Sequence, residues 1–190
     1  MAPSERASVA VFGGSFNPPH VGHVLAAAYV LACASVDRVL IVPTYVHPFA
    51  KALTPFADRL EMCRLAFRDL ARVSVSDVEA QLGGESLTVR TLEHLHAQHP
   101  EWSMRLVVGT DVVHEMSRWT SPERVRELAP PLILARVGVA PPEGLGELPA
   151  VLPDVSSTAI RAMLQRGDAA DRLLPVRVAS YARERGLYRG

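Results

Sequence analysis

The sequence predicts an α/β fold built on a doubly wound parallel sheet, with helices on both faces and about five to six strands. Short β-rich segments alternate with helical segments from one end of the chain to the other. The strand segments are nearly continuous apolar runs, which is typical of strands that are buried on both faces. The chain has 190 residues, of which 48% are hydrophobic. This length predicts a single domain over residues 1–190 with one substantial core.

Turn residues and apolar runs place the individual elements. Glycines at 13 and 14 end the first strand, and Pro100 stops the helix before it. Residues 138–153 are rich in proline and glycine and are predicted to form a surface loop. Residues from about 154 to 190 are predicted to form a small C-terminal helical part. The predicted strands are 8–12, 36–43, 73–78, 104–108 and 132–137, and the predicted helices are 21–34, 55–71, 86–98, 122–128, 157–165 and 175–185.

Composition excludes several classes of protein. Lys and Arg number 20 and Asp and Glu number 20, so a general binder of nucleic acid or of anionic membranes is not expected. The longest uncharged apolar stretch, residues 24–34, is about half of what a membrane span needs. Residues 1–8 do not resemble a secretory signal. Cys33 and Cys63 lie in apolar surroundings, and we expect both to be buried, reduced thiols of a cytoplasmic protein.

The most informative segment is residues 13–23, GGSFNPPHVGH, which follows the first strand and opens the first helix. Free backbone N–H groups and the positive end of the helix dipole favour a phosphate there. His20 and His23 are three residues apart and therefore face the same side, and Gly22 removes a side chain that would crowd them. The spacing fits neither the dinucleotide fingerprint nor the P-loop. Taken alone, these residues fit a structural role equally well.

A second segment, residues 154–161 (DVSSTAIR), starts another helix. Ser156 or Ser157 is a natural N-cap, and Thr158 adds a further hydroxyl group. Arg161 follows one turn later and could reach the same anion. An ordinary capped helix with a surface arginine is the alternative.

Two features outside these segments are also possible sites. Lys51 is the single lysine among the basic residues, which could mark a site for a compact ammonium group or arise by chance. His94, His96 and His99 look like a metal cluster, but His94 and His96 would point roughly 160° apart on a helix. We therefore expect no metal site formed by side chains.

Several segments together resemble the nicotinate/nicotinamide mononucleotide adenylyltransferases of the nucleotidyltransferase superfamily, which has an HxGH-type turn and a late SSTxxR motif. Besides the two segments above, residues 86–92 (SLTVRTL), 107–111 (VVGTD) with Trp119, and the ending at 186–188 match the family pattern. The resemblance runs from Phe12 to Tyr188. It implies a Rossmann-like nucleotidyltransferase domain.

The resemblance implies an enzyme of NAD biosynthesis that joins ATP to nicotinic acid mononucleotide, giving deamido-NAD and pyrophosphate. The nucleophile is already an anionic phosphate, so in-line attack needs positioning and charge neutralisation rather than a strong base. Mg²⁺ is expected to be carried mainly by the ATP phosphates and water. The two small-molecule substrates are the expected partners, without nucleic acid or membrane, and a homo-oligomer stays open.

The resemblance also assigns roles to residues. It makes His20, His23 and Arg161 catalytic, with His23 as the transition-state donor. It places adenosine ribose on Gly109 and Asp111, and the pyridine ring on Trp119, beside Thr88 and Asn17. Three alternatives remain open, namely that Trp119 is core, that Asp111 caps the following helix and that Arg136 lies on the surface rather than beside adenine. The implied ATP-binding residues are Gly13, Gly14, Ser15, Phe16, His20, His23, Lys51, Gly109, Asp111, Arg136, Ser157, Thr158 and Arg161.

The sequence departs from the family pattern at three places. His47 and Lys51 are separated by three residues where many relatives have adjacent His-Lys, Leu87 stands in place of a tyrosine, and the loop 138–153 is short. The alternatives left open are an enzyme that uses nicotinamide mononucleotide or both mononucleotides, a phosphopantetheine adenylyltransferase or cytidylyltransferase, and a non-catalytic nucleotide-binding module. Trp119 argues against the other transferases, because it suits a flat ring.

Overall fold

The structure is a computed structural model that describes residues 6–49, 52–135, 147–148, 153, 155–170 and 172–189. Its centre is a sheet of 6 described strands in the order β3-β2-β1-β4-β5-β6, with every neighbouring pair parallel. The order reverses between β1 and β4, and ligands of such sheets bind at this switch point. The strands are β1 (Ala7–Gly14), β2 (Arg38–Pro43), β3 (Val73–Val75), β4 (Trp102–Gly109), β5 (Pro131–Leu134) and β6 (Glu147–Leu148).

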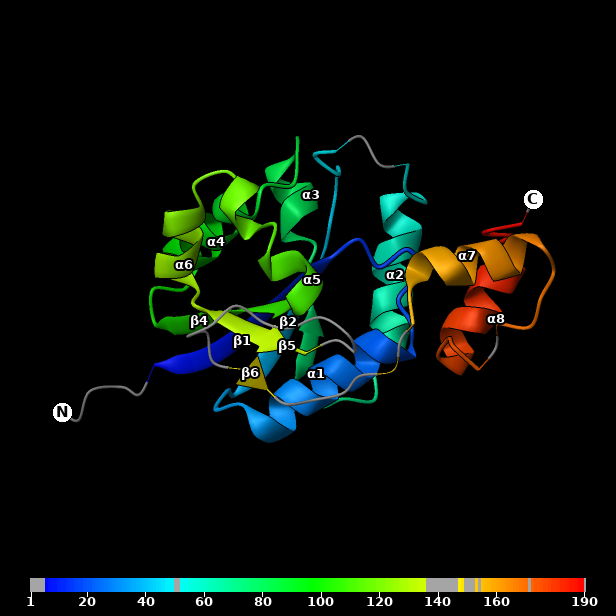
Figure 1. Cartoon of the computed structure of the whole chain (residues 1–190), viewed down its shortest axis with the longest axis horizontal. Coiled ribbons are helices and arrows are strands. Elements are labelled where there is room, and N and C mark those ends of the chain that lie inside the picture. The colour runs from blue at the N-terminus through cyan, green and yellow to red at the C-terminus, as the bar shows by residue number, and fades with distance from the viewer. Residues whose placement is uncertain are drawn as a thin grey trace.

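Helices cover both faces of this sheet, as the apolar strands predict (Figure 1). They are α1 (Val21–Cys33), α2 (Phe56–Phe67), α3 (Val78–Leu82), α4 (Thr88–Gln98), α5 (Thr110–Val113), α6 (Pro122–Leu128), α7 (Ser157–Gln165) and α8 (Val176–Glu184), with a 3₁₀ turn, η1 (Met116–Arg118). Successive residues of a strand point to opposite faces. The strands therefore supply two separate apolar cores.

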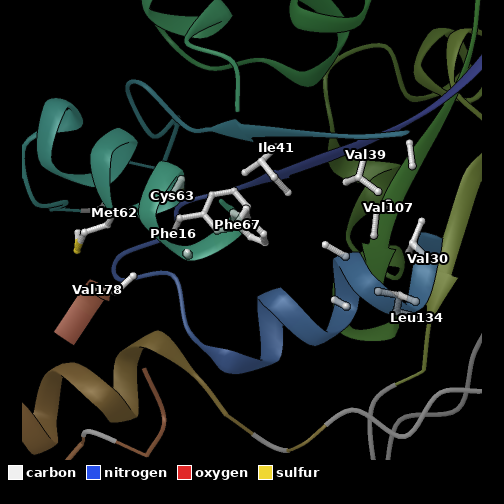
Figure 2. Close-up of a cluster of buried hydrophobic side chains, with 14 of the residues drawn as sticks. Phe16, Val30, Val39, Ile41, Met62, Cys63, Phe67, Val107, Leu134 and Val178 are labelled. Atoms are coloured by element: carbon white, nitrogen blue, oxygen red, sulfur yellow. The ribbon is translucent and has the colours of Figure 1, made fainter. Parts of the chain in front are cut away.

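The first core lies between the sheet and α1, α2, α7 and α8. Ala10 and Ile41 of the sheet pack there with Phe16, Phe67 and Val178, all buried. Figure 2 shows Phe16 and Phe67 next to each other in this core, with ring centroids 6.2 Å apart. The C-terminal helices thus pack on the same core as the sheet.

The second core lies on the opposite face, under α3, α4 and α6. The neighbouring strand residues Val9, Val11 and Leu40 contribute to it, together with Val78 and Leu92 of the helices. These two cores bring the loops at the carboxyl ends of β1, β2 and β4 to a common edge.

Each strand and helix predicted from the sequence is present, but several bounds differ. β1 continues through the two glycines that were expected to end it. β3 has only 3 residues, and the predicted strand gives way to α3 at Val78. The predicted loop 138–153 contains β6, which pairs with β5 at Leu134, and the rest of that loop lies almost entirely outside the described residues.

Two further observations concern the cysteines and the membrane. Cys63 is buried as predicted, whereas the prediction was wrong for Cys33, which is exposed near the end of α1. In the part of the chain that the structure describes, no helix is both long and apolar enough to cross a bilayer.

Candidate active site

A cavity of about 730 Å³ opens at the carboxyl ends of the central strands. The loop after β1 and the start of α7, which are far apart in the sequence, both line it. The start of α4 and the segment after η1 line it as well. Of the residues predicted from the sequence, the wall contains Gly13, Gly14, Ser15, His20, His23, Thr88, Gly109, Trp119, Ser157 and Thr158.

The two histidines form a stacked pair at the start of α1. His20 is the buried N-cap residue, and its backbone N–H donates to Nδ1 of His23 over 3.1 Å. The ring centroids lie 3.7 Å apart, with an interplanar angle of 28°. A neutral imidazole whose Nδ1 accepts a hydrogen bond carries its proton on Nε2. His23 is therefore set up to donate Nε2–H to an anion.

Two neighbours explain the geometry of this pair. A Cβ at Gly22 would lie 3.0 Å from Nδ1 of His20, so only glycine leaves the ring where it is. Phe16 is buried against His23, with ring centroids 4.9 Å apart. Phe16 was predicted to bind ATP, but it is not among the described residues of the cavity wall and instead supports the His23 ring.

Asn17 is also placed behind the cavity rather than on its described wall. Its side chain is buried, and its Oδ1 accepts a hydrogen bond of 2.8 Å from the hydroxyl of Tyr188. Burial raises the pKa of Tyr188 to about 12. This bond connects the loop after β1 to the C-terminal segment, and the contact of Asn17 with the mononucleotide stays a prediction.

The start of α7 is bonded directly to the loop after β1. Ser156 is the N-cap and accepts from the N–H of Ala159, so Ser157 is available for another partner. The hydroxyl of Ser157 donates to the carbonyl oxygen of Pro18 over 2.9 Å. Arg161 donates to the carbonyl of Asn17 over 2.8 Å. These bonds fix the two predicted phosphate segments against each other.

Arg161 does not itself appear in the described cavity wall. Its second hydrogen bond, of 3.3 Å, goes to Oγ1 of Thr158, which does line the cavity. A guanidinium has five N–H donors. The two bonds therefore leave it donors that an anion at Thr158 could engage.

The other end of the cavity lies over the second core. Trp119 is half-buried, packs against that core and also lines the cavity, so its core contact leaves part of the side chain facing the cavity. Leu87 and Thr88 at the start of α4 form the neighbouring wall. Gly109 ends β4 and is the N-cap of α5. Asp111 lies within that helix and is therefore not its cap.

Some predicted residues cannot be placed on this wall. Lys51 and Arg136 lie outside the described residues, as does Asp154 at the start of the second segment. Among the residues that the structure describes, no group of 3 or more His, Cys, Asp or Glu side chains could hold a metal ion.

Arg59 is a structural feature of the site that the sequence analysis missed. It is 1% exposed, and it donates to the carbonyl oxygens of Thr54, Ser15 and Tyr45 at 2.8, 2.9 and 3.4 Å. Burial lowers the pKa of its guanidinium. Arg59 therefore joins the loop after β1 to the loop after β2. The available signal was the spacing in α2, where Arg59 lies three residues after Phe56 and four before Cys63, on the side of the helix that carries apolar residues.

Comparisons with known proteins agree with this geometry. The cytidylyltransferase-like family model matches residues 11–163. A probable nicotinate-nucleotide adenylyltransferase of Anaeromyxobacter sp. (strain K) is 48% identical over 96% of this chain and 97% of its own length. A protein of the same description from Myxococcus xanthus is 42% identical over 95% of this chain and 94% of its own length.

A solved structure shows the same fold. The Plasmodium falciparum nicotinic acid mononucleotide adenylyltransferase in complex with NaAD superposes with a TM-score of 0.84 at 17% identity, over 96% of this chain and 97% of that one. The resemblance found from the motifs is thus confirmed. The chain belongs to the cytidylyltransferase-like family and, within it, to the nicotinate-nucleotide adenylyltransferases.

Proposed function

We propose that this chain transfers the adenylyl group of ATP to nicotinic acid mononucleotide, forming deamido-NAD and pyrophosphate. One observation carries the proposal: a single cavity joins the His20–His23 pair and the start of α7 to a distant wall with Trp119 and Thr88. The first group suits phosphates, and the second suits a flat ring. The names of the curated relatives support the same reaction.

The reaction is an in-line displacement at the α-phosphorus of ATP. A phosphate oxygen of the mononucleotide forms the new P–O bond, while the bond to the β-phosphate breaks and pyrophosphate leaves with the electron pair. The nucleophile is already anionic, so the protein must position the groups and neutralise the developing charge. Nε2–H of His23 would donate to the phosphate oxygens on which that charge develops.

The start of α7 would hold the leaving group. Ser156, Ser157 and Thr158 line the cavity there, and Arg161 donates a hydrogen bond to the hydroxyl of Thr158. A helix N-terminus with a cation beside it is a strong site for the β- and γ-phosphates. Mg²⁺ would be bound by phosphate oxygens and water, where it neutralises charge on the triphosphate.

The remaining assignments follow from the walls of the cavity. Gly13 has no other heavy atom within 4 Å of where its Cβ would be, so the backbone offers close approach to a ligand. Gly109 with Asp111 would bind the adenosine ribose, and Trp119 would stack on the pyridine ring. Lys51 and Arg136 keep their proposed contacts with phosphate and adenine. We place this activity in the cytoplasm.

The test is pyrophosphate release with ATP, Mg²⁺ and one acceptor at a time. We expect turnover with nicotinic acid mononucleotide, and its loss in His23→Ala. Turnover with phosphopantetheine instead would identify a different transferase of the superfamily. Binding of ATP without turnover of nicotinic acid mononucleotide, nicotinamide mononucleotide or phosphopantetheine would favour a non-catalytic module and contradict the proposal.

A further inference from the structure

The charges on the cavity wall are unevenly distributed. Among the described residues that line it, Arg118 is the one arginine or lysine, and the acidic residues are Glu79 and Glu115. Glu79 already accepts hydrogen bonds from the N–H of Tyr45 and the hydroxyl of Thr91, at 3.0 and 3.1 Å. Within the described part of the chain, the Arg118 side chain has no hydrogen bond or ion pair. Among the described residues, this permanent cation thus faces the cavity without an ion pair to Glu79 or Glu115.

Arg118 lies at the ring end of the cavity and not at the phosphate end. It is the last residue of η1 and directly precedes Trp119. Trp119 and Leu87 both pack on the second core, whereas α1 and α7 pack on the first. The neighbouring wall residues Leu87 and Thr88 carry no charge. A charged group on a ring bound here would therefore meet Arg118.

The chemistry of the two candidate acceptors supplies that group. Nicotinic acid mononucleotide carries a carboxylate on the pyridine ring where nicotinamide mononucleotide carries a neutral carboxamide. A guanidinium binds a carboxylate through two parallel charge-assisted hydrogen bonds. A carboxamide offers it one neutral oxygen and an amino group that is itself a donor.

We propose that the Arg118 side chain binds the ring carboxylate and so makes the chain select nicotinic acid mononucleotide over nicotinamide mononucleotide. This inference rests on the proposed function and names the residue that sets its substrate. Glu115, one turn earlier, opposes the effect because its carboxylate lines the same cavity. The balance between the two side chains then determines the preference.

The test compares kcat/KM for the two mononucleotides in the wild type and in variants. The ratio is kcat/KM for nicotinic acid mononucleotide divided by kcat/KM for nicotinamide mononucleotide. We expect Arg118→Ala to lower this ratio by about 10- to 100-fold, mostly because kcat/KM for nicotinic acid mononucleotide falls. Arg118→Lys retains the positive charge but loses the paired N–H donors of the guanidinium, so its ratio should lie between those of the wild type and Arg118→Ala. Glu115→Gln should raise the ratio. Arg126→Ala is the matched control, an exposed arginine of α6 outside the described cavity wall.

Three outcomes would overturn the inference. Unchanged kcat/KM values for both mononucleotides in Arg118→Ala would mean that the Arg118 side chain does not bind the carboxylate. An equal loss with both mononucleotides would place Arg118 on a group they share, such as the phosphate. A Kd ratio for deamido-NAD and NAD that Arg118→Ala does not shift would also contradict it, independently of turnover. By contrast, a wild type inactive with nicotinic acid mononucleotide would refute the proposed function itself.

Discussion

Replacing Gly22 by alanine tests whether the position of His20 limits catalysis. The new Cβ would lie 3.0 Å from Nδ1 and 3.1 Å from Cε1 of His20, where ordinary contacts begin at 3.4 Å. The ring must therefore move by about 0.3 to 0.4 Å to restore an ordinary contact. Because His20 stacks on His23 at 3.7 Å, the shift displaces the pair.

The two consequences of this substitution have different sizes. A misplacement of 1 Å at a reacting centre can cost about 100-fold, so about a third of that shift predicts a kcat/KM that is about 5-fold lower. Stability should change little, because alanine gains up to about 1 kcal/mol of helix propensity over glycine, and this gain offsets the clash. Gly22→Ala should thus lower kcat/KM while leaving the free energy of unfolding nearly unchanged.

Pyrophosphate release and urea denaturation measure the two quantities. Ala32→Gly is the matched control, because Ala32 is exposed on the same helix and outside the described cavity wall. We expect it to lose up to about 1 kcal/mol of stability with unchanged kcat/KM. A Gly22→Ala protein with wild-type kcat/KM would refute the argument that the geometry of the histidine pair limits the reaction.

Three other variants test the rest of the site. His23→Ala should lower kcat by about 100- to 1,000-fold while changing unfolding free energy by about 1 kcal/mol, and a protein that keeps most of its turnover would exclude His23 as the donor. Arg59→Met should lose about 2 to 4 kcal/mol in urea denaturation, because three carbonyl acceptors lose a charged donor; an unchanged midpoint would contradict this. Tyr188 has a pKa of about 12 in the fold and 10.0 ordinarily, so its deprotonation favours unfolding as pH rises through that range. The stability difference between wild type and Tyr188→Phe should therefore shrink from pH 10 to 12 in pH-dependent thermal unfolding, and a constant difference would refute this.

The sequence was most informative where a local pattern determines the structure. Apolar strand segments and glycine or proline stops predicted the order of elements, and α6 and α7 begin and end at the predicted residues. The crowding role of Gly22 was also predictable, because it depends on His20 two residues away. Both segments predicted to bind phosphate do meet at one cavity.

Contacts with a distant partner or with a backbone atom could not be predicted from the sequence. The hydrogen bond of Asn17 with the hydroxyl of Tyr188 joins residues that are 171 positions apart. Arg59 donates to backbone carbonyl groups. Because every residue has such a group, the sequence contains no pattern that identifies the partners of Arg59. The exposure of Cys33 depends on which face of the final turn of α1 meets the core. None of these is fixed by neighbouring residues.

Three side chains that are distant in the sequence donate hydrogen bonds to carbonyl groups of the loop after β1. Arg59 binds the carbonyl of Ser15, Arg161 that of Asn17, and Ser157 that of Pro18. A carbonyl oxygen facing a triphosphate would repel it, so a phosphate-binding loop must engage its carbonyls elsewhere and leave donors for the anion. The two arginines do this with a positive charge that also favours the ligand. We therefore expect Arg59 and Arg161 to favour anion binding through the backbone, even though neither is part of the described cavity wall.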